Sequence, residues 1–167
     1  MRPAPGVQHG FTLLELMVVV VIVGIVVAVA VGGYGSIIAE SRVNDVSNRL
    51  RGFIALARNE SISRGGNVRL CGSTDGYTCV ASMNDGWLIY YDADTDDVLD
   101  ATDEIVSWQE QDHAATAVAV TDRAGNPVNN IEFNYRGYTP REMSVTTTSN
   151  AVSRVVVVHR TGRLEQL

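Results

Sequence analysis

The run GFTLLELMVVVVIVGIVVAVAV at residues 10–31 is where this sequence departs most from that of an ordinary globular protein. From Phe11 to Val31 it holds about 21 residues, enough for a helix to cross a hydrocarbon core of roughly 30 Å. Arg2 precedes the run, which favours a cytoplasmic N-terminus. No small-residue cleavage site of the usual secretory kind follows it. We therefore expect the run to be retained in the mature protein as a transmembrane and assembly helix over residues 11–33.

Glu15 is the one ionisable residue within this apolar run. A carboxylate at the centre of a membrane helix costs roughly 2.5–3.5 kcal/mol on insertion scales, and less near the interface. The run contains no arginine that could neutralise it. A free amine created by cleavage just before Phe11 could do so, either about one helical turn away in the same chain or on an adjacent subunit. The alternative is a carboxylate that is solvated at the membrane interface.

The hexapeptide Gly10–Glu15, followed at once by the apolar run, resembles the class III signal of type IV pilins and type II secretion pseudopilins. The resemblance implies that residues 1–10 are a leader peptide, that prepilin peptidase cuts after Gly10, and that the new N-terminus, Phe11, is methylated. It also implies that Glu15 helps to dock each new subunit. The expected partners are other minor and major pilins or pseudopilins, prepilin peptidase, the inner membrane and the assembly platform.

The same resemblance implies where the protein is located. Before assembly it would span the inner membrane once, with its head in the periplasm. After assembly it would belong to a filament, near the tip of that filament.

Three small residues in the apolar run, Gly24, Ala28 and Gly32, recur every four positions and so share one helix face. Small residues at this spacing let helices approach closely in an apolar environment, which favours a packing seam. The alternative is a chance spacing in a valine-rich helix.

Residues 34–65 continue the helix with an amphipathic pattern. Apolar residues recur at spacings of three and four, which predicts one buried stripe; its members are Val43, Val46, Leu50, Phe53 and Ala57. The pair Gly65-Gly66 predicts the end of the helix.

Residues 66–167 read as a head made of strands and turns. The candidate strands are 67–71, 86–92, 104–111, 115–121, 130–136, 142–148 and 154–160. Val155–Val158 is a continuous apolar run, which suits a central buried strand. A long helix followed only by strands predicts an α+β fold in which the helix packs on a head of antiparallel β-sheets.

Short segments of the second half of the helix and of the head resemble the GspH/FimT class of minor pilins. They are Arg58–Ser61, the strand into Cys71, Gly86–Asp92, and a terminal strand ending in Gly162-Arg163. The class includes minor pseudopilins of type II secretion and FimU- and FimT-like minor pilins. The resemblance implies a long helix with two small antiparallel sheets, and a minor pilin that helps to initiate or decorate a type IV pilus. A minor pseudopilin of a type II secretion system is the first alternative.

Cys71 and Cys79 are the only cysteines and lie eight positions apart. In a head outside the cytoplasm this pair predicts a disulfide that closes a short loop. The alternative, a metal site, lacks further ligands at a useful spacing.

An acidic segment, residues 92–104, follows the predicted strand 86–92. Five aspartates occupy offsets 1, 3, 5, 9 and 12 of a calcium loop; they are Asp92, Asp94, Asp96, Asp100 and Asp103. The sixth offset is Asp97 instead of glycine, the twelfth is a short aspartate, and the flanks are strand-like. The alternatives are therefore a calcium site and a solvated acidic hairpin, and no other cofactor is expected.

Composition and motifs argue against an enzyme. The three histidines, His9, His113 and His159, lie in separate segments with no paired ligand pattern. No phosphate-binding glycine loop, serine-nucleophile motif or zinc spacing appears. We therefore expect no catalytic residues.

DNA binding is a rival role from a different class. FimT-like members bind DNA through a C-terminal Gly-Arg-x-Arg motif, and this chain has Gly162-Arg163-Leu164-Glu165, with an acid in place of the second arginine. The net charge of −6 also argues against a surface built broadly for nucleic acid. Arg154, Arg160 and Arg163 remain candidate phosphate contacts in a weak, salt-dependent patch.

Overall fold

A computed structural model of the protein describes residues 11–112 and 115–167, except for the side chains of residues 29–33. The chain divides into two compact units, Met1–Ile37 and Ile38–Leu167. We call the second unit the head unit. The expected leader, residues 1–10 with Gly10, lies outside the described residues, as does His113.

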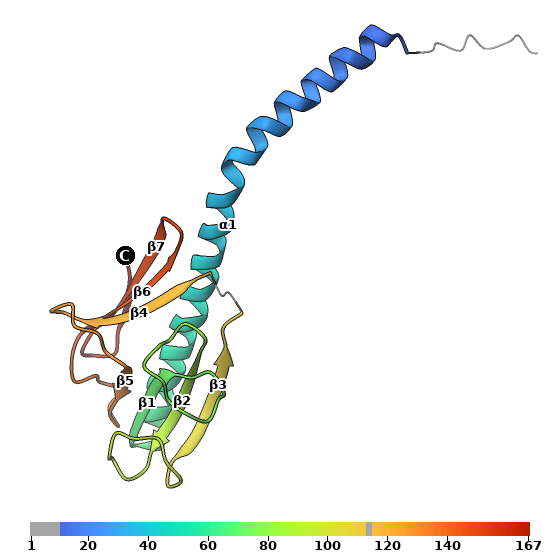
Figure 1. Cartoon of the computed structure of the whole chain (residues 1–167). Coiled ribbons are helices and arrows are strands. Elements are labelled where there is room, and N and C mark those ends of the chain that lie inside the picture. The colour runs from blue at the N-terminus through green and yellow to red at the C-terminus, as the bar shows by residue number, and fades with distance from the viewer. Residues whose placement is uncertain (1–10, 113–114) are drawn as a thin grey trace, which may run out of the picture. The chain divides into compact units, whose positions relative to one another are not determined.

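One helix, α1 (Leu13–Arg64), runs through both units (Figure 1). Thr12 is its N-cap, and the hydroxyl of Thr12 accepts a hydrogen bond from the amide of Glu15 at 3.3 Å. It ends at Gly65, which has a φ of 67°. The amide of Gly66 then donates to the carbonyl of Ser61 at 3.2 Å, the bond that closes a Schellman motif. The helix end predicted from Gly65-Gly66 is therefore confirmed.

A transmembrane helix over residues 11–33 is not confirmed. Among the described residues, no helix combines the length and the apolar character needed to cross a membrane. The side chains of residues 29–33, which belong to the expected span, lie outside that description.

The strands of the head unit form two four-stranded antiparallel sheets. The first sheet has the order β3-β2-β1-β5, with β1 (Asn67–Gly72), β2 (Gly86–Asp92), β3 (Glu104–Glu110) and β5 (Asn130–Phe133). The second sheet has the order β4-β6-β7-β8, with β4 (Ala117–Asp122), β6 (Met143–Ser149), β7 (Val152–Val158) and β8 (Leu164–Gln166). The prediction of an α+β fold with antiparallel sheets is confirmed.

All seven predicted strands are present, but some of their limits were wrong. The strand expected at 130–136 ends at Phe133, because Asn134–Gly137 forms a turn closed by a hydrogen bond from Gly137 N to Asn134 O at 2.7 Å. The strand expected at 154–160 is β7. Gly162-Arg163 was expected at the end of a terminal strand and instead lies in the turn before β8, which the sequence did not predict.

Val155–Val158 lies in an interior strand as predicted, but it is not continuously buried. Val156 and Val158 are buried, whereas Val155 and Val157 are half-buried. The reason is that an antiparallel sheet with one face on the core alternates its side chains between core and surface.

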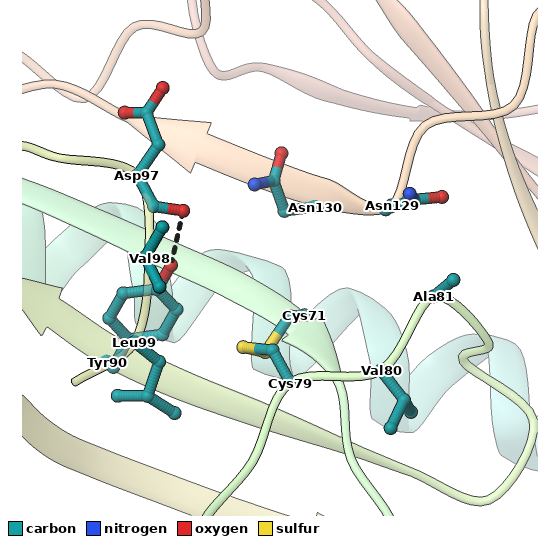
Figure 2. A pocket seen from close by; sticks show the side chains of 10 residues that line it. All are labelled: Cys71, Cys79, Val80, Ala81, Tyr90, Asp97, Val98, Leu99, Asn129 and Asn130. Atoms are coloured by element: carbon teal, nitrogen blue, oxygen red, sulfur yellow. Dashed lines mark hydrogen bonds between the residues drawn. A yellow bond between two sulfur atoms is a disulfide. The ribbon is translucent and has the colours of Figure 1, made fainter.

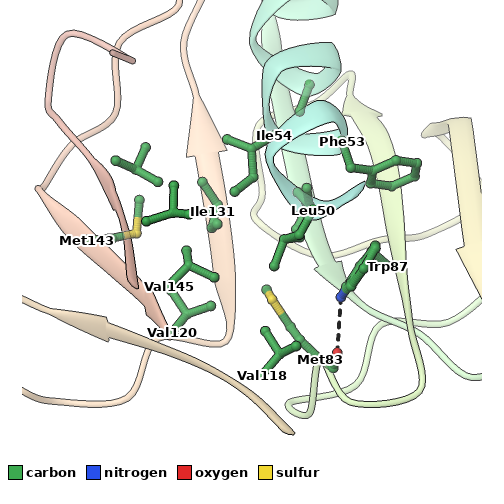
Figure 3. Packing of buried hydrophobic residues seen from close by; sticks show 14 of the residues in the cluster. Leu50, Phe53, Ile54, Met83, Trp87, Val118, Val120, Ile131, Met143 and Val145 are labelled. Atoms are coloured by element: carbon green, nitrogen blue, oxygen red, sulfur yellow. Dashed lines mark hydrogen bonds between the residues drawn. The ribbon is translucent and has the colours of Figure 1, made fainter. Parts of the chain in front are cut away.

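The core of the head unit lies where α1 meets both sheets (Figure 3). The helix contributes Leu50, Ile54 and the ring of Phe53, whose centroid lies 6.2 Å from that of Trp87. The indole N–H of Trp87 donates to the carbonyl of Met83 at 3.0 Å, so this large buried side chain leaves no polar atom unpaired. All five residues of the predicted stripe are buried: Val43, Val46, Leu50, Phe53 and Ala57.

Candidate functional site

The first turn of α1 forms a structural unit of its own. Thr12 and Glu15 have the spacing of a capping box, in which the hydroxyl at the N-cap accepts from the amide three residues later. Glu15 thus lies in the first helical turn, where a carboxylate interacts favourably with the helix dipole. Phe11 precedes this turn and is 80% exposed. The geometry therefore makes Thr12 the N-cap of α1, a role that the sequence interpretation did not include.

The described part of the N-terminal unit presents only exposed side chains. The large apolar ones expose between 49% and 80% of their surface, far above the level of core residues. Gly24 has open space around the position that a Cβ would occupy, and Ala28 is exposed. Such a surface needs an apolar covering, since large exposed apolar patches mark protein or membrane interaction sites. Gly32 lies outside the described side chains, and the packing seam stays a prediction.

The predicted disulfide between Cys71 and Cys79 is present, with a Cα–Cα distance of 5.7 Å. Asp75 organises the loop that the bond closes. One oxygen, Oδ1, accepts from the amides of Tyr77 and Thr78, both at 2.8 Å, and Oδ2 accepts from the Thr78 hydroxyl at 2.8 Å. These hydrogen bonds, those from the two amides foremost, lower the pKa of Asp75 from 3.8 to about 2. The loop is therefore held by a covalent bond and by a carboxylate that stays ionised.

Arg69 on β1 is a buried cation that the sequence interpretation missed. It is 3% exposed, and its Nε donates to Oδ2 of the fully buried Asp92 at 2.6 Å. Its guanidinium also pairs with Asp97, and with Glu132 at 3.5 Å. Burial by itself lowers the pKa of Arg69. The hydrogen bond to Asp92 and the three nearby negative charges raise this pKa by more than burial lowers it, so the net shift is upward. This cluster joins β1, β2, β5 and the acidic segment.

The acidic segment is shaped by its own carboxylates. Asp103 accepts from the amides of Ala93 at 2.9 Å and Asp100 at 3.2 Å, and Asp100 accepts from the amide of Thr102 at 2.7 Å. Asp97 adopts a φ of 73°, so the turn for which glycine was missing is made by an aspartate.

The five predicted calcium ligands therefore divide into two groups. Asp92, Asp94 and Asp96 each place a carboxylate oxygen within 4.8 Å of the others. Asp92 is at the same time the partner of the buried Arg69, which offsets its charge. Asp100 and Asp103 stabilise the segment through backbone amides. Calcium binding stays a prediction.

An open cleft of about 290 Å³ lies between the disulfide loop and the acidic segment (Figure 2). The disulfide and Tyr90 lie within it, and the hydroxyl of Tyr90 donates to the carbonyl of Asp97 at 3.5 Å. Its lining residues come from β1, β2, the two loops and the start of β5; they are Cys71, Cys79, Val80, Ala81, Tyr90, Asp97, Val98, Leu99, Asn129 and Asn130. The lining mixes apolar groups with two carboxamides, the Tyr90 phenol and the Asp97 carboxylate.

Comparison with known families identifies the chain. Residues 46–162 match the profile of the family described as type II transport protein GspH, which is more than half of the chain. The chain belongs to the GspH family. Residues 6–31 match the prokaryotic N-terminal methylation motif. This GspH-family protein thus carries the motif and the head profile that the resemblance had implied.

Two solved structures have the same fold. The type IV minor pilin FimU of Pseudomonas aeruginosa superposes with a TM-score of 0.60 at 14% identity, over 77% of this chain and 90% of FimU. The minor pseudopilin EpsH from the type II secretion system of Vibrio cholerae gives a TM-score of 0.51 at 10% identity, over 76% of this chain and 96% of EpsH. A search of curated protein sequences found no match. At these identities the two structures establish the fold of this GspH-family chain.

The three arginines proposed for DNA are not gathered into one patch of free charge. Arg154 lies on β7, and its guanidinium contacts Glu40 at 3.5 Å and the Asn44 carboxamide at 3.1 Å. Arg163 pairs with Glu165 at 2.8 Å in the turn beyond β7. In the described chain, Arg160 has no carboxylate partner. Two of the three candidate contacts are thus already neutralised within this GspH-family head, and DNA binding stays a prediction.

His159, for which the sequence showed no paired ligand pattern, is part of a small charged cluster. Its Nδ1 lies 2.9 Å from Glu142 and its Nε2 lies 2.9 Å from Glu165. The hydrogen bond to His159 and the charge of Arg163 lower the pKa of Glu165. This cluster ties β8 to the β5–β6 side of the head, and no local sequence pattern could have revealed it.

Proposed function

We propose that this GspH-family protein is a minor pilin that helps to initiate or decorate the assembly of a type IV pilus. Cleavage by prepilin peptidase after Gly10 and methylation of Phe11 would precede assembly. The subunit would be anchored in the inner membrane with its head in the periplasm and would then enter the filament near its tip. Its partners would be other minor and major pilins and the assembly platform.

One observation carries the proposal. The methylation motif at residues 6–31 leads directly into a helix whose described residues before Ile38 are all exposed and mostly apolar. Burial of this surface would contribute roughly 25 cal/mol for each Å² removed from water. A lipid bilayer before assembly and neighbouring helices after assembly both provide that covering.

Glu15 provides the test. We expect Glu15→Ala to reduce incorporation into filaments while insertion into the membrane stays normal, because an assembly partner of the carboxylate would be lost. Incorporation is measured by immunoblotting of sheared filaments, and insertion by membrane fractionation. Normal incorporation of Glu15→Ala would contradict the role assigned to this side chain.

Thr12→Ala is the matched control for helix initiation. It removes the hydroxyl that accepts from the Glu15 amide and retains the carboxylate. Losing an N-cap costs about 0.5–2 kcal/mol of helix stability. If Thr12→Ala impairs incorporation as strongly as Glu15→Ala, the first turn matters for its structure and the docking role of Glu15 is wrong.

A minor pseudopilin of a type II secretion system is the second candidate. The family description, type II transport protein GspH, favours this candidate, and the fold is also that of the minor pseudopilin EpsH. The likeness to FimU has the higher TM-score and supports the pilus. Deletion of the gene separates the two functions: loss of surface pili supports the first, and loss of protein secretion with normal pili supports the second.

The proposed role is structural and not enzymatic. The family and the two superposed structures are pilin-like subunits. Variants of the head should therefore change filament assembly or protein stability and not a catalytic rate.

A further inference from the structure

Two loops that are distant in sequence meet beside the C-terminal part of α1. The amide of Thr139, in the loop between β5 and β6, donates to the carbonyl of Arg160, in the turn between β7 and β8, at 3.0 Å. Arg58 of α1 joins both loops, with Nε donating to Gly137 O at 3.1 Å and a terminal nitrogen donating to Thr161 O at 3.2 Å.

Close packing fixes this junction. A Cβ added to Gly162 would lie 2.2 Å from the carbonyl oxygen of Gly137, and Gly162 has a φ of 73°, so only glycine suits the position. Within the first loop, the Asn134 carboxamide oxygen accepts from the amides of Arg136 at 2.9 Å and Tyr138 at 3.0 Å. The loops therefore present their side chains from a rigid base.

The two loops carry five exposed side chains, which we call the arginine–tyrosine surface: Tyr135, Arg136, Tyr138, Pro140 and Arg160. Of these, Tyr138, Pro140 and Arg160 line one hollow, and Tyr135 and Arg136 lie in the turn that precedes Tyr138. The two tyrosines expose 52% and 47% of their surface. The guanidinium of Arg136 lies 5.1 Å from the ring centre of Tyr135. A hollow of about 310 Å³ borders Tyr138 and Arg160. Tyrosine and arginine on a rigid support are the residues that most often carry the binding energy of protein interfaces.

Neither Arg136 nor Arg160 pairs with a carboxylate in the described chain. Other arginines of the head do so, among them Arg49, Arg64 and Arg69. An unpaired guanidinium with its fork of donors suits a carboxylate or a phosphate. The surface is thus complementary to a local negative charge.

The surroundings favour a protein carboxylate over a nucleic acid. Glu132 lines the same hollow, and Glu142 and Glu165 lie beside His159 in the adjoining turn. The chain as a whole carries a charge of −6. A long polyanion would meet this negative field along its length, whereas a single carboxylate needs only one guanidinium.

We propose that the arginine–tyrosine surface docks a carboxylate-bearing surface of a neighbouring filament subunit. This inference rests on the proposed function, since it requires that the chain enters a filament. The two tyrosines would bury their rings against the neighbour, and Arg136 and Arg160 would pair with its carboxylates.

Site-specific photocrosslinking in cells that assemble filaments tests the contact. p-Benzoylphenylalanine replaces Tyr138, and in a control strain it replaces Tyr77, an exposed tyrosine on the disulfide loop. We expect an adduct from position 138 with another pilin-like subunit, and mass spectrometry of the joined peptide should find aspartate or glutamate next to the crosslink. Arg160→Glu or Arg136→Ala should reduce this adduct about tenfold, a loss of roughly 1.4 kcal/mol. Arg123→Glu, an equal charge change in the exposed β4–β5 turn, should leave it unchanged.

Each contrary outcome has a distinct meaning. A subunit present in sheared filaments that gives no protein adduct from position 138, or an adduct that persists in Arg160→Glu, overturns this inference alone. A subunit absent from filaments overturns the proposed function and this inference with it.

Duplex DNA titrated into the purified head, residues 38–167, should not bind. Binding that Arg160→Glu abolishes would show that the surface is a nucleic-acid site and would overturn the inference. The head suits this assay because it contains every buried side chain of the described chain.

Discussion

The two parts of α1 have opposite relations to solvent. Before Ile38, every described side chain is exposed, although most are apolar. After Ile38, one stripe of the same helix is buried to 7% exposure or less, while its other faces carry charges. Both parts are helical, but among the described residues only the second packs against sheets of its own chain. The head is therefore stabilised by contacts within its own chain, whereas the described apolar side chains of the N-terminal part have no such contacts.

The largest effect should come from the buried cation of the head. Arg69→Met leaves Asp92 buried without its cation, and breaking such a pair costs about 3–5 kcal/mol of unfolding free energy. Urea denaturation of the purified head measures the loss. Adding Asp92→Asn removes the uncompensated charge and should restore part of the stability. A loss below about 1 kcal/mol in the single variant would show that solvent reaches this pair.

A matched pair of isoleucines tests the comparison directly. Ile54 is fully buried and Ile22 is 55% exposed, and both lie on α1. Ile54→Ala should destabilise the head by about 2–5 kcal/mol, since it leaves a cavity in the core. Ile22→Ala should change thermal unfolding of the full chain by no more than about 0.5 kcal/mol. Equal effects would contradict the division of α1 into a stability part and an assembly part.

The disulfide should have a smaller effect. Replacing both Cys71 and Cys79 by serine removes the crosslink over a sequence separation of eight residues, for which the chain-entropy account gives at most about 2–3 kcal/mol. The consequence should be local, with faster hydrogen exchange in residues 73–79 than in β1. Uniformly faster exchange throughout the head would instead assign the bond a global role.

The smallest effect should be a dependence on acidic pH. The folded pKa of Asp75 is about 2, below its usual 3.8, so its contribution to stability is complete above the usual value. That contribution is lost as the pH falls from about 4 towards 2, and the lowered pKa values of Asp122 and Glu165 act in the same direction. Thermal unfolding of the head between pH 7 and pH 2 should show this decline, and Asp75→Asn should make it shallower. A wild-type head that gains stability on acidification would reverse the sign and refute the account.

Local patterns in the sequence predicted the elements of the fold. The spacing of Val43, Val46 and Leu50 indicated the buried stripe of α1, and Gly65-Gly66 indicated its end, because both depend on residues within a few positions of each other. The limits of the strands were less accurate. The turn after Phe133 and the short β8 depend on hydrogen bonds to partners that the sequence does not reveal.

By itself, the sequence determined the class of this protein: a motif at residues 10–15, an apolar helix over residues 11–31, and a strand-rich head closed by one disulfide. These properties follow from neighbouring residues, so they can be read in order along the chain. Only the tertiary structure decided that Arg69 pairs with Asp92, that two of three candidate arginines are neutralised, and that Tyr138 and Arg160 share one surface. Most of these juxtapositions join residues more than 20 positions apart, and they exist because strands and turns from distant parts of the chain meet in the fold. The pair Arg163–Glu165 is close in sequence and depends on the turn that leads into β8.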